Sequence, residues 1–183
     1  MTNTRNAIAG RKVAILVANH IDAAVIHAVR KALESGAATV KILAPQLGEI
    51  KSDEGHNYKG QNGGKLIKVD HSFAKISSIL LDAVFIPGGQ LSAQALCQDA
   101  NAVLFLKEAY LHGKAIAASD EGVMLLTQAA GKLQFQEQGV ITSAGNAVDK
   151  AFIQHFVEAV AQHRFTERMD LELVVANVLA EIM

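Results

Sequence analysis

Short apolar runs alternate with longer amphipathic segments along this chain, and the pattern predicts an α/β fold. The short runs are nearly all apolar and rich in β-branched residues, as is typical of strands buried on both faces of a parallel sheet. The longer segments carry apolar residues at helical spacing. The predicted strands span residues 13–18, 39–44, 83–86, 114–118 and 140–142. The predicted helices span the segment after Asp22 and residues 101–111, 121–130 and 148–162.

Strands that alternate with helices of this length form βαβ crossovers, which cover both faces of a parallel sheet. We therefore expect a flavodoxin-like three-layer α/β/α sandwich with a mostly parallel central sheet. Asp22 is predicted to cap the first helix, and Gly36 is predicted to take the C′ position at its end.

Two segments depart from the alternation of strands and helices. The polar stretch 48–68 predicts a small antiparallel excursion around residues 49–51 and 66–69. The last segment has apolar residues at helical spacing, which predicts an added C-terminal helix at about 166–183. Because the sequence holds no internal repeat and no Pro-rich or Ser-rich linker, we expect residues 1–183 to form a single domain.

The net charge and the cysteine and histidine content argue against several classes of binding partner and against a metal site. The 17 basic and 18 acidic residues nearly cancel, so neither nucleic acid nor an anionic membrane is an expected partner. A single cysteine excludes a disulfide within the chain, and the seven histidines show no zinc-binding spacing, so no metal is expected. The N-terminus lacks the apolar core of a signal peptide, and no apolar run is long enough to span a bilayer. We expect a cytoplasmic protein.

Ligands of open parallel sheets bind beyond the carboxyl ends of the strands, and the turn after the first strand is one such place. Asn19 and Asp22 are binding candidates there, and His20 lies between them. The alternative is that Asp22 serves only as a helix cap. Because the turn has neither GxGxxG nor GxxxxGK, nucleotide phosphate binding has little support.

Two further strand ends carry candidate chemistry. Gly88 and Gly89 follow a buried strand, where their amides form either an oxyanion hole or only a tight turn. Ser119, Asp120 and Glu121 stand where a nucleophile elbow would lie. The GxSxG pattern of serine hydrolases is absent there, and the alternative role of these three residues is to cap the next helix.

Cys97 is the other candidate nucleophile in the sequence. It lies on a predicted helical face with apolar neighbours, and no strand-end turn presents it. A lone cysteine in such a place is usually a small core residue, and we expect that role for Cys97.

Three segments together resemble the ThiJ/PfpI superfamily, which has the class I glutamine amidotransferase-like fold. They read VAILVANHID, LDAVFIPGG and KEAYLHGKAIAASDEGVMLL. Active members carry a cysteine two residues before a glycine in the elbow, usually followed by histidine. Counting back from Gly122 puts Asp120 and Glu121 at these positions, and Ala24 stands near the expected acidic partner. The resemblance thus implies the fold and also the loss of the thiol chemistry.

One branch of the superfamily is similar in more detail, namely the C-terminal domain of large-subunit haem catalases. The similar segments are GRKVAILVA, LGEIKSDEG, DAVFIPGG, KEAYLHGKAIA and the helix ending AQHRF. The resemblance implies a role in stability, assembly or access to a catalase core. It also implies that the partner is that core or further copies of the chain. Haem would enter only through the core, and this chain would hold no cofactor itself.

Three hypotheses remain open on the sequence. The leading one is a catalytically silent domain with a stability, assembly or chaperone-like role. The second is an enzyme in which Asp120 or Glu121 acts as base or nucleophile and the Gly88 and Gly89 amides stabilise the oxyanion. The third is a small-molecule sensor with a pocket near Asn19, Gly89 and Asp120.

Overall fold

A six-stranded parallel sheet forms the centre of the structure, a computed structural model that describes residues 7–53, 64–130, 138–143 and 148–168. The strand order is β6-β3-β1-β7-β8-β9, and every pairing in this sheet is parallel. Its strands are β1 (Lys12–Leu16), β3 (Thr39–Ala44), β6 (His71–Ser72), β7 (Ala83–Ile86), β8 (Ala115–Ser119) and β9 (Val140–Ser143). The predicted α/β fold is confirmed.

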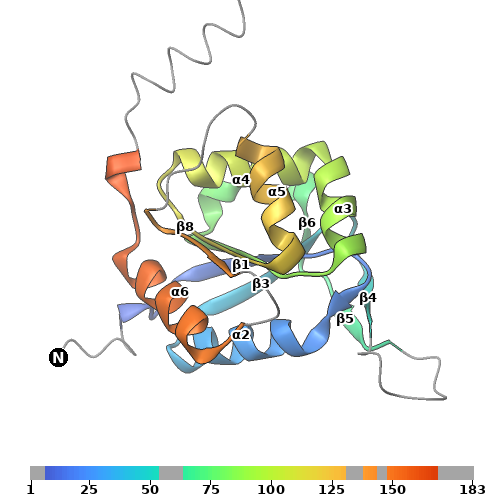
Figure 1. The fold of residues 1–183 in the computed structure, drawn as a ribbon, viewed down its shortest axis with the longest axis horizontal. Coiled ribbons are helices and arrows are strands. Elements are labelled where there is room, and N and C mark those ends of the chain that lie inside the picture. The colour runs from blue at the N-terminus through green and yellow to red at the C-terminus, as the bar shows by residue number, and fades with distance from the viewer. Residues whose placement is uncertain (1–6, 54–63, 131–137, 144–147, 169–183) are drawn as a thin grey trace, which may run out of the picture.

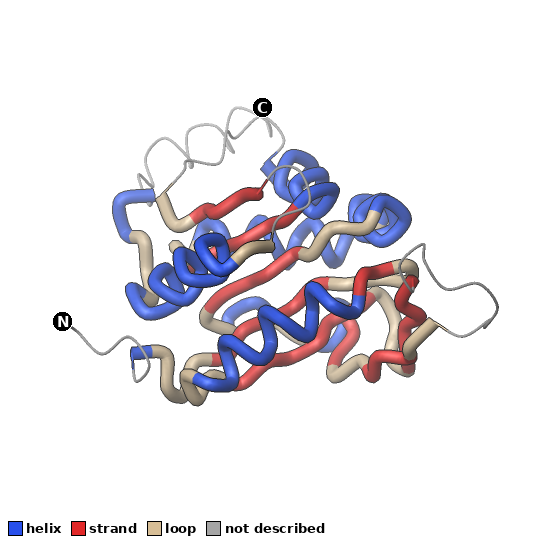
Figure 2. Tube along the Cα trace, turned by 60° about the horizontal axis from the view of Figure 1, so that its bottom comes forward, coloured by secondary structure: helices blue, strands red, loops and turns tan. Residues whose placement is uncertain are grey.

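Helices cover both faces of this sheet, as Figures 1 and 2 show. On one face lie α2 (Ala23–Ser35) and α6 (Lys150–Gln162). The other face carries α3 (Gln90–Gln98), α4 (Ala100–Leu111) and α5 (Val123–Ala130). The result is the three-layer sandwich that the sequence predicts.

The pleat of each strand sends alternate side chains into two separate cores. In β1, Val13 and Ile15 join the core beneath α2 and α6, whereas Ala14 and Leu16 join the core beneath α3, α4 and α5. All four are fully buried, which explains why the strand reads as a continuous apolar run.

Most predicted elements are present with small shifts of their ends. The predicted strand 39–44 matches β3, whereas the predicted strand 13–18 begins and ends earlier, as β1. The predicted helix 121–130 is wrong at its start, because a 3-10 turn η3 (Asp120–Gly122) precedes α5. At the start of the predicted C-terminal helix, the structure has the 3-10 turn η4 (Thr166–Arg168). The rest of the predicted helix, residues 169–183, lies outside the described residues.

The ends of α2 show one confirmed prediction and one correction. Asp22 Oδ1 accepts a hydrogen bond of 2.8 Å from the Ala24 amide, so Asp22 is the predicted N-cap. At the other end, the residue with left-handed backbone is Ala37, at φ 61°, and not Gly36, at φ −92°. The Ala38 amide bonds to the Leu33 carbonyl, as in a Schellman motif with Ala37 at C′. The predicted C′ position was therefore one residue too early.

A three-stranded sheet, β2-β4-β5, lies beside the main sheet. β4 (Glu49–Asp53) and β5 (Leu66–Lys68) pair antiparallel, with Glu49 opposite Lys68, which confirms the predicted excursion. β2 (Ile21–Asp22) adds a short parallel pairing that the sequence pattern did not reveal.

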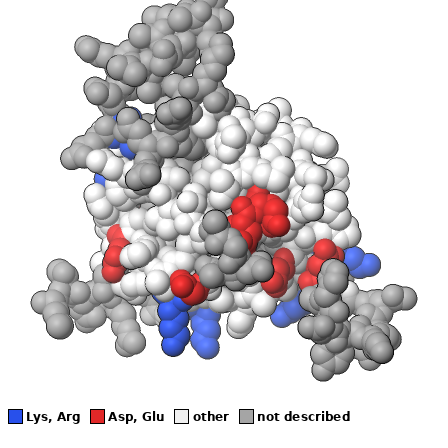
Figure 3. Space-filling view, in the orientation of Figure 1, with Lys and Arg blue, Asp and Glu red and all other residues white. Residues whose placement is uncertain are grey.

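The surface seen in Figure 3 carries small separate groups of acidic and basic side chains on a mostly uncharged background. Within the described part of the chain, none of the helices has the length and apolar content that crossing a bilayer would need.

Candidate functional site

The carboxyl ends of β1, β7 and β8 meet at one edge of the sheet, where the sequence placed its candidates. A side-chain Cβ at Gly89 would lie 2.9 Å from the His20 carbonyl oxygen, in the turn after β1. A Cβ at Gly88 would lie 2.8 Å from the Asp120 Cβ, in the turn after β8. A side chain at either position would collide with a neighbouring turn, so both positions need glycine. With glycine there, the turns after β1, β7 and β8 lie in contact.

The turn after β8 has the backbone shape of a nucleophile elbow although it lacks the GxSxG sequence pattern. Asp120 has φ 46°, in the left-handed region, which aspartate tolerates better than most residues. Two residues later, a Cβ at Gly122 would come within 2.5 Å of the Ile86 carbonyl oxygen. The elbow is thus built from a strained aspartate and a glycine pressed against the end of β7.

The amides of Gly88 and Gly89 both donate to oxygens of this elbow. Gly88 N–H donates to Ser119 Oγ at 3.1 Å, and Gly89 N–H donates to Glu121 Oε2 at 2.9 Å. The hydrogen bond from the Gly89 amide, together with the amide of Glu121 itself, lowers the pKa of the Glu121 carboxyl. The two donors expected to form an oxyanion hole are in place, but the chain's own hydroxyl and carboxylate occupy them.

The role of Ser119 differs from the helix cap considered above. Its side chain is fully buried and makes no capping hydrogen bond to η3. Ser119 instead joins the end of β8 to the turn after β7.

Asn19 and Asp22 both bind backbone of this chain. Asn19 Oδ1 accepts a hydrogen bond of 2.9 Å from the Lys51 amide, which attaches the turn after β1 to β4. Asp22 caps α2, and His20 Nδ1 lies 2.9 Å from Asp53 Oδ1. The structure therefore gives Asn19 and Asp22 structural contacts near the edge where Gly89 and Asp120 lie.

Cys97 lies on α3, where it is partly buried and packs against the core beneath α3, α4 and α5. Burial raises the pKa of its thiol, which lowers the fraction of reactive thiolate. Among the residues that the structure describes, no group of three His, Cys, Asp or Glu side chains is arranged to hold a metal ion.

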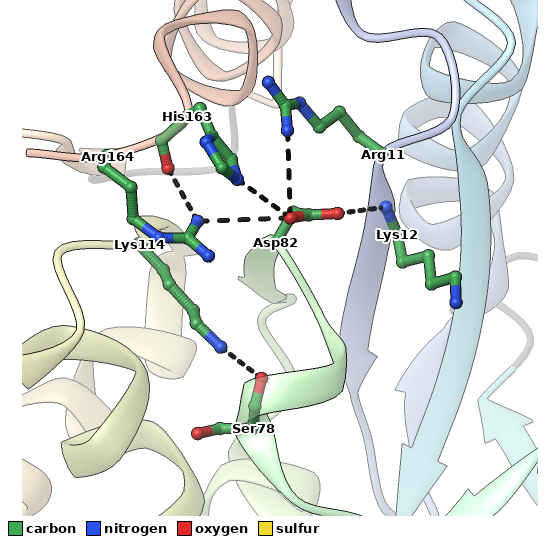
Figure 4. Close-up of polar contacts among 7 residues, drawn as sticks. All are labelled: Arg11, Lys12, Ser78, Asp82, Lys114, His163 and Arg164. Carbon is green, nitrogen blue, oxygen red and sulfur yellow. Dashed lines mark hydrogen bonds and ion pairs between the residues drawn. The ribbon is translucent and has the colours of Figure 1, made fainter.

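A second polar cluster, around Asp82, lies at the opposite edge of the sheet (Figure 4). Asp82 Oδ2 accepts a hydrogen bond of 2.9 Å from the Lys12 amide, and Oδ1 lies 3.1 Å from His163 Nε2. Arg11 and Arg164 each place a guanidinium nitrogen 4.0 Å from the same oxygen. Burial alone would raise the pKa of Asp82, but the hydrogen bonds from Lys12 and His163 and the positive charge of Arg11 hold it below its ordinary value.

Lys114 is the most unusual member of this edge, because its side chain is only 1% exposed. Its Nζ donates to the Ser78 carbonyl, and Ser78 Oγ donates to Glu108 on α4. Burial first, and then the positive charge of Arg164, lowers the pKa of Lys114 to about 8. Lys114 was not among the residues predicted from the sequence, although a charge directly before the fully apolar run AIAA could have marked it.

Comparison with known proteins places this fold in a family. The sequence pattern of the C-terminal domain found in long catalases matches residues 9–170. The chain belongs to this family. It is 34% identical over 177 residues to Catalase HPII of Mycobacterium avium, and the match covers 92% of this chain and 24% of that catalase. It is 32% identical to Catalase-2 of Bacillus subtilis, covering 86% of this chain and 21% of that protein.

This chain therefore spans about a quarter of the length of the catalases that it matches. Many solved structures share the fold, and two of them illustrate it. A ThiJ/PfpI domain protein from Brachyspira murdochii superposes with a TM-score of 0.66 at 16% identity, over 84% of this chain and 98% of that chain. A two-domain protein from Anabaena variabilis with DJ-1/ThiJ/PfpI-like and ferritin-like domains gives 0.64 at 23% identity, over 83% and 49%. The expected ThiJ/PfpI-like fold is confirmed.

Replacing Glu121 tests its contact with the Gly89 amide. Glu121→Ala removes the acceptor, so we expect faster hydrogen exchange at the Gly89 amide and a stability loss of about 0.5–1 kcal/mol. NMR-detected exchange and urea unfolding measure the two effects. Glu34→Ala is the matched control, because Glu34 only pairs with Arg30 on the surface of α2. Unchanged exchange at Gly89 would contradict the contact.

The buried lysine predicts a rise of stability with alkaline pH. Lys114 loses its proton near pH 8 when folded and near its ordinary 10.5 when unfolded, so the unfolded state binds more protons between these values. We expect the free energy of unfolding to rise by about 1–2 kcal/mol over this range relative to Lys114→Met. Urea unfolding between pH 7 and 10.5 measures the difference, with Lys31→Met on the exposed face of α2 as control. Parallel profiles for wild type and Lys114→Met would refute it.

Proposed function

We propose that this chain is a catalytically silent domain of a large-subunit catalase, which contributes stability or assembly rather than a reaction of its own. Its similarity to the end of long catalases, over a quarter of their length, supports this role. In this proposal the domain is cytoplasmic and contacts the catalase core or further copies of itself. The core holds the haem, and this chain holds no cofactor.

The observation that carries the proposal is the occupied pair of amides at Gly88 and Gly89. Acyl-transfer chemistry at an elbow needs free backbone donors for the developing oxyanion. Here those donors bind Ser119 Oγ and Glu121 Oε2 at 3.1 and 2.9 Å. A substrate oxygen would have to displace an internal carboxylate and then lie beside two acidic side chains, Asp120 and Glu121, which would repel a negative charge.

The elbow side chain itself supports the same conclusion. A carboxylate at position 120 cannot form the thioester or hemithioacetal that a cysteine thiolate forms. No histidine follows it, because Glu121 stands in that position. The one thiol of the sequence, Cys97, lies on α3 with its pKa raised by burial. The domain thus retains the backbone of a reactive site without a nucleophile or base suited to it.

The two alternative functions have less support. An enzyme that used Glu121 as general base would need a carboxyl pKa raised toward neutrality, whereas the Gly89 amide lowers it. A sensor with a pocket at Asn19, Gly89 and Asp120 would need polar groups available to a ligand. Asn19 binds the Lys51 amide, and the Gly89 amide binds Glu121.

The purified chain is expected to turn over dicarbonyls, peptides and esters at the background rate. Asp120→Ala is expected to leave that rate unchanged, because the proposal gives Asp120 no chemical role. Colorimetric and fluorogenic assays over a range of substrate concentrations make the measurement. If turnover were well above background and Asp120→Ala abolished it, the proposal of a catalytically silent domain would be wrong. That result would instead support an enzyme that uses the Asp120 carboxylate.

The accessory role predicts a second effect in a catalase that carries this domain. Deleting the domain is expected to lower the temperature of half-inactivation or to change the oligomeric state, because contacts that stabilise the folded core are lost. Peroxide turnover per haem at 25 °C should stay unchanged. Thermal inactivation and sedimentation measure these effects. Loss of turnover per haem with unchanged stability and assembly would contradict the accessory role.

A further inference from the structure

Helix α4 lies in the layer of helices on one face of the sheet (Figure 1) and is apolar on its outer side as well as on its inner side. Only three of its 12 side chains carry an amide or a charge, namely Asn101, Lys107 and Glu108. On the outer side, Ala100 and Leu104 are exposed and Leu111 is half-buried, and the three follow one another at helical spacing. A helix that is apolar all round is normally covered on both sides, so the outer side of α4 indicates a contact with another molecule.

Two further apolar side chains are exposed beside α4. Ile79 and Leu80 lie on the 3-10 turn η2 (Ser78–Leu80), with 69% and 61% of their surface exposed. η2 packs on α4, where Leu104 is 53% exposed. We call Ile79, Leu80 and Leu104, together with the groove beside them, the η2–α4 surface.

The groove extends this surface along α4. It has a volume of about 310 Å³, and Phe73, Ile76, Leu104 and Phe105 supply apolar parts of its wall. Glu108 also lines it, so the groove adjoins η2, whose Ser78 binds this glutamate. Exposed apolar side chains that gather around a groove usually mark a protein interaction surface.

The exposed side chains of η2 stand on a fixed support. Ser78 Oγ donates to Glu108 Oε2 on α4 at 3.2 Å, and the buried Lys114 donates from its Nζ to the Ser78 carbonyl. These two hydrogen bonds hold η2 against α4 from both sides of Ser78. A surface that is already ordered loses little conformational entropy when a partner binds it.

The charges of this surface favour a second copy of the chain as the partner. Lys75 and Glu108 both line the groove, so it carries a cation and an anion beside an apolar centre. Such a surface complements itself, because a twofold axis can set the cation of one copy against the anion of the other. A surface for nucleic acid or for an anionic membrane would instead gather basic side chains.

We propose that two copies of this chain form a symmetric dimer through the η2–α4 surface, with α4 packed on α4. Leu104 lies near the middle of α4, so two helices that cross at this residue cover the outer sides of both. Lys75 of each copy then faces Glu108 of the other. This inference rests on the assembly role proposed above, and it names the partner and the surface. Because the surface is small beside those of permanent complexes, the dimer dissociates on dilution.

Leu104→Glu in the full chain tests the proposal, with Leu91→Glu as the matched control. Leu91 is also helical and is 54% exposed, but it lies in the first turn of α3, two residues after Gly89. Sedimentation equilibrium between about 1 μM and 1 mM spans the dissociation constants of weak dimers. Wild type and Leu91→Glu are expected to dimerise with the same Kd. Leu104→Glu puts a charge at the centre of the contact and is expected to raise Kd at least about tenfold, as is Ile79→Glu on η2.

The charge pairing has its own variant. Lys75→Glu sets two carboxylates against each other and is also expected to raise Kd, whereas Lys31→Glu on the exposed face of α2 is not. An unchanged Kd for Lys75→Glu would refute the pairing of Lys75 with Glu108.

Two results would overturn the dimer. A chain that stays monomeric up to about 1 mM would show that no second copy covers the surface, and the catalase core would then be the partner to test. A dimer that Leu104→Glu and Ile79→Glu weaken no more than Leu91→Glu does would show that the contact lies elsewhere. Neither result bears on the silent elbow, which the turnover assays with Asp120→Ala test separately. Turnover above background would in turn overturn the silent domain and leave the dimer in place.

Discussion

The close approach of the turn after β7 to the turn after β8 is the constraint on which the rest of the site depends. Gly122 leaves no room for a side chain against the Ile86 carbonyl, and Gly88 leaves none against Asp120. With both turns at this distance, the oxygens of Ser119 and Glu121 fall within hydrogen-bond reach of two consecutive amides. Packing of two parallel strands thus decides which groups the amides bind.

The turn after β8 has a strained backbone conformation that a contact within the structure accounts for. A non-glycine residue with positive φ costs about 1–2 kcal/mol, so a position without function would be free to relax or to become glycine. Asp120 keeps φ 46°, and the neighbouring Glu121 binds the Gly89 amide. The Glu121 carboxylate thereby gives the strained turn a structural use, since it joins η3 to the start of α3. In this structure the strained turn thus positions a contact within the fold.

The sequence predicted the features that depend on local pattern and missed those that depend on distant partners. The buried strands are continuous apolar runs, and Asp22 caps α2 through the amide two residues away. β6 has two residues and no pattern to reveal it. Counting from Gly122 identified Asp120 as the elbow residue, but nothing local indicates that Glu121 binds Gly89, 32 residues away. The Asp82 cluster was missed for the same reason, because its members come from four separate segments.

That cluster fixes both ends of the described domain to one central strand. The Lys12 amide and Arg11 lie where the chain enters β1, and His163 and Arg164 lie where it leaves α6. Asp82, at the start of β7, binds both pairs. Because entry and exit of the chain meet at one carboxylate, the start of β1 and the end of α6 lie close together, as is common for the ends of domains. A domain whose two ends lie together can be joined to a larger protein without a change at its strand-end site, where Ser119 and Glu121 bind the Gly88 and Gly89 amides.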